Sequence, residues 1–116
     1  MPRIIEIRSY NLKPGTRAEF ERIAHSVVRP MLEQHGTDVV AMRPSLADEN
    51  SYCLIRAYTD TAERDASQAK FYGGKAWRHG PREAILARIE SHATIVMEVA
   101  EATIDGLRDR AVAGQV

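Results

Sequence analysis

The stretch Ile5-Glu6-Ile7-Arg8-Ser9-Tyr10 alternates apolar or small side chains with charged or aromatic ones. A period of two residues predicts a β-strand with one apolar face and one polar face. The segments 52–58 and 93–99 repeat this alternation, and residues 39–43 form a shorter apolar run that Pro44 closes. We therefore expect four strands, with the second and third joined as a hairpin.

The first expected helix follows the first strand. Thr16 and Glu19 have the spacing of a capping box, and Gly36 is placed to end the helix in a left-handed conformation. The apolar stripe of this helix has helical spacing and consists of Phe20, Ile23, Ala24, Val27 and Met31. Because Pro30 lacks an amide donor, we expect a kink between residues 26 and 29.

A second helix is expected to begin at Asp60, with Glu63 completing its capping box, and to end at Gly73-Gly74. A stripe of small residues on this helix would allow close packing on the sheet: Ala62, Ala66 and Ala69. After a linker, Gly80-Pro81 begins a further short helix, and the last strand follows. The tail, residues 101–116, has a weak helical pattern of Ile104, Leu107 and Ala111, and we assign the domain itself to residues 1–100.

The resulting order β-α-β-β-α-β is typical of a ferredoxin-like α+β fold, an antiparallel four-stranded sheet with helices on one face. We expect the helices to cover the apolar side chains: Ile5, Ile7, Cys53, Ile55, Ala57, Ala93, Ile95 and Met97. The other face would carry Glu6, Arg8, Tyr10, Tyr52, Leu54, Arg56, Tyr58, Thr94 and Val96. Because that face is too apolar to be left in water and too charged to form a dry core, we expect a homodimer that encloses it as a semi-polar chamber between two sheets, a dimeric α+β barrel.

Composition restricts the partners of this chain of 116 residues. Sixteen Lys and Arg balance sixteen Asp and Glu, so no net charge attracts nucleic acid or an anionic membrane. A single cysteine, Cys53, cannot form an internal disulfide. Charged residues interrupt the N-terminal apolar residues before they form the core of a signal peptide, and we expect a cytoplasmic protein.

Two runs of residues resemble the NIPSNAP family. The first run consists of residues 5–10, followed by Leu12-Lys13-Pro14-Gly15 and Glu33-Gln34-His35-Gly36. The second run is Ala76-Trp77-Arg78-His79-Gly80-Pro81-Arg82-Glu83-Ala84-Ile85-Leu86. The resemblance covers about residues 3–99 and implies the dimeric α+β barrel. It implies no reaction, because bacterial members mostly have none assigned and the family offers no established catalytic residue. Residues 101–116 lie outside it.

Five side chains are candidates for binding a small organic acid or an aromatic molecule: Arg8, Tyr10, Arg56, Tyr58 and Trp77. The arginines would lie on adjacent central strands, and a guanidinium matches a carboxylate or phosphate in geometry. The aromatic rings would form the walls. The alternative is that Glu6 pairs with one arginine and Glu98 with the other, which would make the cluster a structural network.

Catalytic motifs are weak. His79, between Arg78 and Arg82, is a weak candidate acid or base, although a histidine in a polar loop is more often solvated. The four histidines have no metal-binding spacing, and no dinucleotide or phosphate-binding glycine motif occurs, so we expect no metal and no cofactor.

Two functions stay open: a binding or structural module without catalysis, and a cofactor-independent monooxygenase-like enzyme acting on a small aromatic or acidic substrate. A closed apolar pocket beside His79 would favour the enzyme. Mutual pairing of Glu6, Arg8 and Arg56 would favour the structural module.

Overall fold

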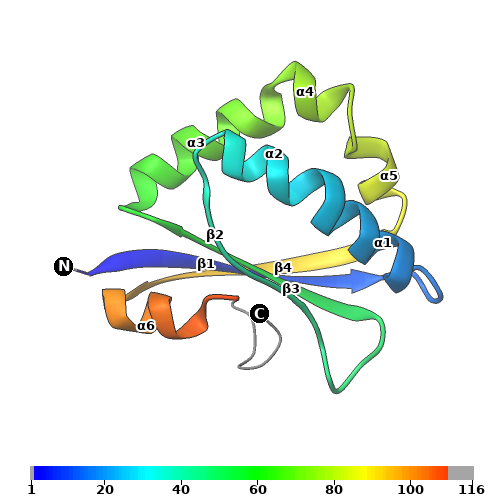
Figure 1. Ribbon diagram of the computed structural model, residues 1–116, viewed down its shortest axis with the longest axis horizontal. Helices are drawn as coiled ribbons and strands as arrows, with labels where there is room; N and C mark the ends of the chain where they lie inside the picture. The colour runs from blue at the N-terminus through cyan, green and yellow to red at the C-terminus, as the bar shows by residue number, and fades with distance from the viewer. Residues whose placement is uncertain (1, 110–116) are drawn as a thin grey trace.

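Four antiparallel strands form one sheet in the order β2-β3-β1-β4 (Figure 1). The strands are β1 (Arg3–Leu12), β2 (Asp38–Pro44), β3 (Ser51–Tyr58) and β4 (Ile89–Val99). They are seen in a computed structural model that describes residues 2–109. The order of strands and helices confirms the ferredoxin-like α+β fold, and the last strand begins four residues earlier than the alternation predicts.

The first helical segment is continuous from residue 17 to residue 34 and contains one π-helical turn. It consists of α1 (Arg17–Ile23), η1 (Ala24–Val28) and α2 (Arg29–Gln34). The amide of Arg29 donates to the carbonyl of Ala24, five residues earlier. The π turn therefore lies just before Pro30, in the region where a kink was predicted. Gly36 has a φ of +93° and follows the helix in the left-handed conformation, as expected.

The two predicted capping boxes have different outcomes. Asp60 caps α3 (Thr61–Gly73), because its Oδ1 accepts a hydrogen bond of 2.8 Å from the amide of Glu63. The box at Thr16 is wrong. The Thr16 hydroxyl instead donates to the carbonyl of Lys13 at 2.6 Å, which closes the turn before α1, and Glu19 pairs with Arg22.

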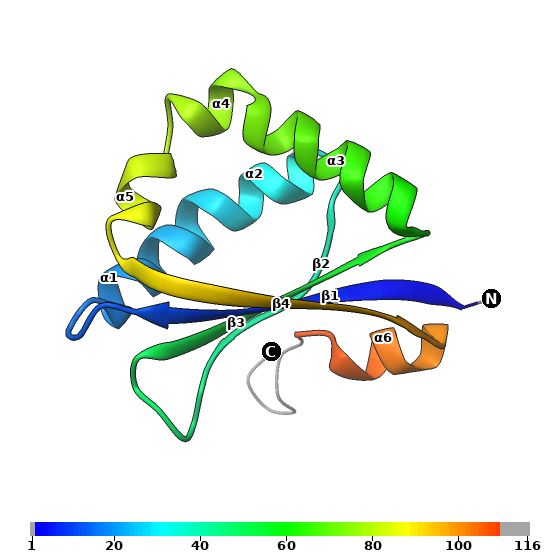
Figure 2. The same ribbon diagram turned by 180° about the vertical axis from the view of Figure 1, so that it is seen from behind.

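The second helical region has three helices. After α3 come α4 (Lys75–Arg78), which occupies the expected linker, and α5 (Arg82–Leu86). All the helices from α1 to α5 lie on one face of the sheet (Figures 1 and 2). The alanines that we expected to pack on the sheet, Ala62, Ala66 and Ala69, are exposed on α3, so that assignment is wrong. No helix within residues 2–109 has the length and hydropathy needed to cross a membrane.

The helices cover the opposite face of the sheet from the one that we predicted. Glu6 accepts hydrogen bonds from Arg64 and Gln68 of α3, and Arg56 donates to the hydroxyl of Tyr72 on the same helix. The predicted polar face is thus the buried, helix-covered face. The assignment was wrong because α3 supplies polar partners, so burying this face leaves few polar groups without a hydrogen bond.

The apolar face of the sheet is partly covered by the C-terminal helix, α6 (Glu101–Leu107), which lies on the side away from the other helices (Figure 2). Ile104 of α6 is completely buried in a cluster with Ile5, Val40, Ala41, Ile55 and Ala57. Arg108 pairs with Asp38 at 2.7 Å, which holds the end of α6 against β2. The described part of the tail, residues 101–109, therefore docks on the sheet, while Ala111 lies outside the described residues.

Candidate functional site

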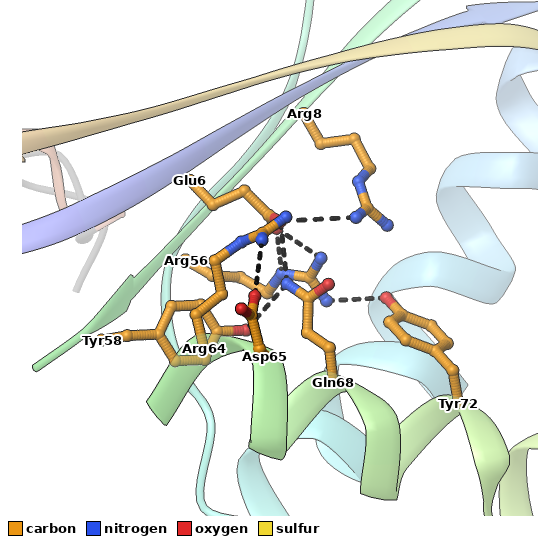
Figure 3. A network of polar contacts seen from close by, with 8 residues as sticks. All are labelled: Glu6, Arg8, Arg56, Tyr58, Arg64, Asp65, Gln68 and Tyr72. Atoms are coloured by element: carbon orange, nitrogen blue, oxygen red, sulfur yellow. Dashed lines mark hydrogen bonds and ion pairs between the residues drawn. The ribbon is translucent and has the colours of Figure 1, made fainter. Parts of the chain in front are cut away.

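A single carboxylate, that of Glu6 on β1, organises the polar cluster between the sheet and α3 (Figure 3). Glu6 lies opposite Arg56 in the pairing of β1 with β3, and its Oε1 accepts from the Arg56 Nε at 2.9 Å. Its Oε2 accepts from the Arg64 Nη2 at 2.6 Å and from the Gln68 Nε2 at 2.8 Å. The Arg8 Nη2 is more distant, at 3.4 Å. Both oxygens of this fully buried carboxylate are satisfied.

The cluster keeps Glu6 ionised. Burial alone would raise the pKa of this carboxyl group. The charge of Arg56, the hydrogen bond from Gln68 and the charge of Arg8 outweigh burial and lower the pKa of Glu6 from 4.5 to about 2. Glu6 is therefore an anion at neutral pH, and it is a poor candidate for a general base.

The cluster contains more positive than negative charge. Three guanidinium groups, those of Arg8, Arg56 and Arg64, surround the one carboxylate of Glu6. Arg64 also pairs with Asp65 at 3.1 Å on the surface, which leaves one positive charge without a counterion among these groups. Arg8 makes the longest contact with Glu6, and its buried Nε has no hydrogen-bond partner among the described residues. The surplus charge is thus located at Arg8.

Tyr72 of α3 connects this charged cluster to an aromatic region. Its hydroxyl accepts a hydrogen bond of 2.6 Å from the Arg56 Nη1. The guanidinium carbons of Arg56 and Arg8 lie 5.6 Å and 5.9 Å from the centre of its ring, which is within the range of cation–π contacts. The ring of Trp77 meets the ring of Tyr72 edge to face at 5.2 Å. Tyr72 thus contacts two of the three guanidiniums.

Two spaces adjoin Tyr72. One is an enclosed apolar cavity of about 30 Å³, lined by Tyr10, Phe20, Ala24, Val28, Met42, Tyr52, Leu54, Tyr72, Trp77 and Ile85. The other is an open groove of about 580 Å³, which we call the outer groove, lined by Tyr72, Gly73, Arg78, His79 and Arg82. The cavity has the volume of one or two water molecules, so a larger ligand needs the outer groove or a movement of the Tyr72 ring.

All five predicted ligand-binding residues lie on the helix-covered side of the sheet, and not on the open side where they were expected. Arg8, Arg56 and Trp77 surround Tyr72. Tyr10 lines the small cavity with Trp77, and Tyr58 joins the network through Gln68 at 3.3 Å. The alternative pairing of the second arginine with Glu98 is absent from the ion pairs of the described residues, because Arg8 and Arg56 both pair with Glu6.

Sequence reasoning missed the contribution of α3. Arg64, Gln68 and Tyr72 are spaced i, i+4, i+8, so they share one face of the helix and all contact the Glu6 cluster directly or through Arg56. This spacing was visible in the sequence as a polar stripe. The alanine stripe of the same helix predicts the wrong face, because small apolar residues usually face a sheet but here are exposed.

His79 is exposed and lines the outer groove with Arg78 and Arg82, and this space is an open groove and not the closed apolar pocket that would favour an enzyme. Trp77 is buried, and its ring packs against those of Phe71 and Tyr72. Within residues 2–109, no group of His, Cys, Asp and Glu side chains has the arrangement of a metal site.

The fold and the cluster define a ferredoxin-like α+β protein with a charged network between its sheet and its helices. The NIPSNAP family model matches residues 5–101, and the chain belongs to the NIPSNAP family. The resemblance seen in the two sequence runs is therefore confirmed. Helix α6 lies almost entirely beyond the matched residues.

Solved structures with the same fold include several bacterial NIPSNAP proteins. An uncharacterised NIPSNAP domain protein from Burkholderia xenovorans is 19% identical, with a TM-score of 0.75 over 84% of this chain and 95% of that one. A NIPSNAP family protein from Agrobacterium tumefaciens is 13% identical, with a TM-score of 0.78 over 85% and 87% of the two chains.

A putative antibiotic biosynthesis monooxygenase from Nitrosomonas europaea is 13% identical, with a TM-score of 0.62 over 81% and 95% of the two chains. At these identities the likeness concerns the fold alone. No curated protein matches the chain.

Proposed function

We propose that this NIPSNAP protein is a homodimeric module that binds a small organic anion, whose carboxylate pairs with Arg8. The observation that carries the proposal is the surplus positive charge at Arg8, whose buried Nε has no partner among the described residues. Arg8 shares the carboxylate of Glu6 with two other guanidiniums, so its charge is only partly compensated, and a ligand carboxylate on Arg8 would complete its pairing. The aromatic ring of Tyr72 beside Arg8 favours a flat ligand.

The two arginines of the sheet have separate roles in this proposal. Arg56 is completely buried and makes two hydrogen bonds with Glu6, so it belongs to the structural network. Arg8 is 15% exposed at its side chain and has only the longer contact. The close pairing of Glu6 with Arg56 therefore supports a structural role for these two residues. Arg8 is held less closely and is available to bind a ligand.

Replacing Arg8 with Gln is expected to weaken binding of benzoate, as a simple aromatic carboxylate, by about 10- to 100-fold. The reason is the loss of charge-assisted hydrogen bonds, each of which contributes roughly 1.5–3 kcal/mol. Titration calorimetry at fixed ionic strength measures the change. Arg17→Gln removes the same charge from α1, where Arg17 lines a different groove from the one beside Tyr72, and should leave the affinity unaltered. Equal affinities for wild type and Arg8→Gln would refute the role of Arg8.

The homodimer is proposed on a different set of residues from the one that the sequence indicated. On the face of the sheet away from α1 to α5, α6 covers the side of β2 and β3, while Ile95 and Met97 of β4 remain 61% and 45% exposed beside Ile7. A second copy of the chain would bury this apolar remainder.

We expect light scattering to give twice the monomer mass of 13.0 kDa. Ile95→Glu should shift the protein toward monomer, because an unpaired carboxylate would be buried in the interface. The control Thr94→Glu adds the same charge to an exposed position on the other face of the same strand and should leave the dimer intact. A wild-type monomer at micromolar concentration would contradict the proposal.

The alternative function is a cofactor-independent monooxygenase-like enzyme. The support for it is the fold shared with the putative monooxygenase from Nitrosomonas europaea. Consumption of oxygen when the protein is mixed with an aromatic acid that it binds would favour this alternative. Binding of the acid without oxygen consumption would favour the binding module.

A further inference from the structure

The outer groove contains two arginines that form no ion pair with any described residue. Arg78 and Arg82 line it together with His79, and all three side chains are exposed. Within residues 2–109, neither arginine forms an ion pair, although Arg22, Arg29, Arg43 and Arg108 pair with carboxylates in the same structure. Glu83 follows Arg82 directly in the chain but makes no ion pair with it. The groove is therefore suited to an anionic group.

Tyr72 links the outer groove to the inner cation. The guanidinium of Arg8 lies over the ring of Tyr72, and Tyr72 also lines the groove beside Gly73. Tyr72 is therefore common to the contact with Arg8 and to the lining of the groove, and a flat molecule that bridges the two would lie against it. Figure 3 shows Tyr72 at the margin of the Glu6 cluster, with Arg8 on the same side of it as the cluster.

We propose that the outer groove is a second anion subsite and that the ligand carries two anionic groups joined by a flat, unsaturated body. Arg8 binds the first group, Tyr72 contacts the body, and Arg78 and Arg82 bind the second group. This inference rests on the proposed function, since it uses the inner carboxylate site at Arg8. It narrows the ligand class from organic anions in general to aromatic or conjugated dianions.

The test compares terephthalate with benzoate, which share a ring and differ by one carboxylate. At fixed ionic strength, we expect wild-type protein to bind terephthalate at least about tenfold more tightly, since a further charge-assisted contact forms. The double variant Arg78→Gln/Arg82→Gln should abolish this preference, so that terephthalate and benzoate bind with about equal affinity, and should leave the benzoate affinity unaltered. The control Lys13→Gln/Arg17→Gln removes the same charge near α1 and should keep the preference.

A steric variant tests the position of the second group without changing charge. A Cβ on Gly73 would meet no atom within 4 Å, so a side chain there extends into open space at the groove. Leu favours a helix more than Gly does, so Gly73→Leu should fold. We expect it to weaken terephthalate binding about tenfold and to leave benzoate binding unaltered.

The outcomes separate the two proposals. If benzoate binds in an Arg8-dependent manner but terephthalate binds no more tightly, the second subsite is refuted and the proposed function stands. The same holds if the preference persists in Arg78→Gln/Arg82→Gln or in Gly73→Leu. If neither compound binds at about 10 mM, the proposed anion-binding function itself is refuted.

Discussion

Glu6→Gln is expected to lower the free energy of unfolding by about 3–5 kcal/mol, the effect of leaving a buried charge without its partner. The side chain of Arg56 is completely buried, and Glu6 is its counterion. A Gln at position 6 keeps the volume and one acceptor oxygen but removes the negative charge that three guanidiniums face. Urea unfolding followed by circular dichroism measures the change.

Glu83→Gln is the matched control, because it makes the same chemical change at an exposed carboxylate that forms no ion pair among the described residues. It should alter stability by less than about 0.5 kcal/mol. If Glu6→Gln does not fold, Arg56→Lys provides a second measurement, since it keeps the charge and loses the two-pronged contact with Glu6. A loss below about 1 kcal/mol in both variants would show that the cluster is not a stabilising element.

The strands were predictable from the sequence because alternation is a local property. In β1, Ile5 and Ile7 alternate with Glu6 and Arg8 whichever face is covered. The face itself depends on what packs there. Glu6 is buried because Arg64 and Gln68, some sixty residues later, supply donors to it, and this pairing is not local.

The position of the C-terminal helix depends on similarly distant contacts. The helical spacing of Ile104 and Leu107 predicts an amphipathic segment but not its docking position. That position is set by Arg3, which pairs with Asp38 and Glu101, and by Arg108, which also pairs with Asp38. The candidate site was partly predictable because its strand residues follow from local alternation. Tyr72 could not be predicted as a member of the site, because it joins the site only through tertiary packing.

Acid is expected to destabilise the protein through Glu6 as the pH falls from about 4.5 to about 2. The pKa of Glu6 is about 2 in the folded protein and 4.5 ordinarily, because Arg56, Gln68, Arg8 and Arg64 outweigh the burial that would raise it. The unfolded chain therefore binds the proton more readily. Stabilisation by the ionised carboxylate is complete above pH 4.5 and disappears toward pH 2.

A difference of this size corresponds to about 3 kcal/mol, since each pKa unit contributes about 1.4 kcal/mol. Wild-type protein and Glu6→Gln are to be unfolded by urea at several pH values between 6 and 2. We expect the wild type to lose about 3 kcal/mol more than the variant over this range. The pKa values of Asp38 and Asp109 are also lowered, mainly by arginine partners that oppose the effect of burial, but these residues are present in both proteins and cancel in the comparison. Parallel stability curves for the two proteins would show that Glu6 is not held ionised by its arginine partners.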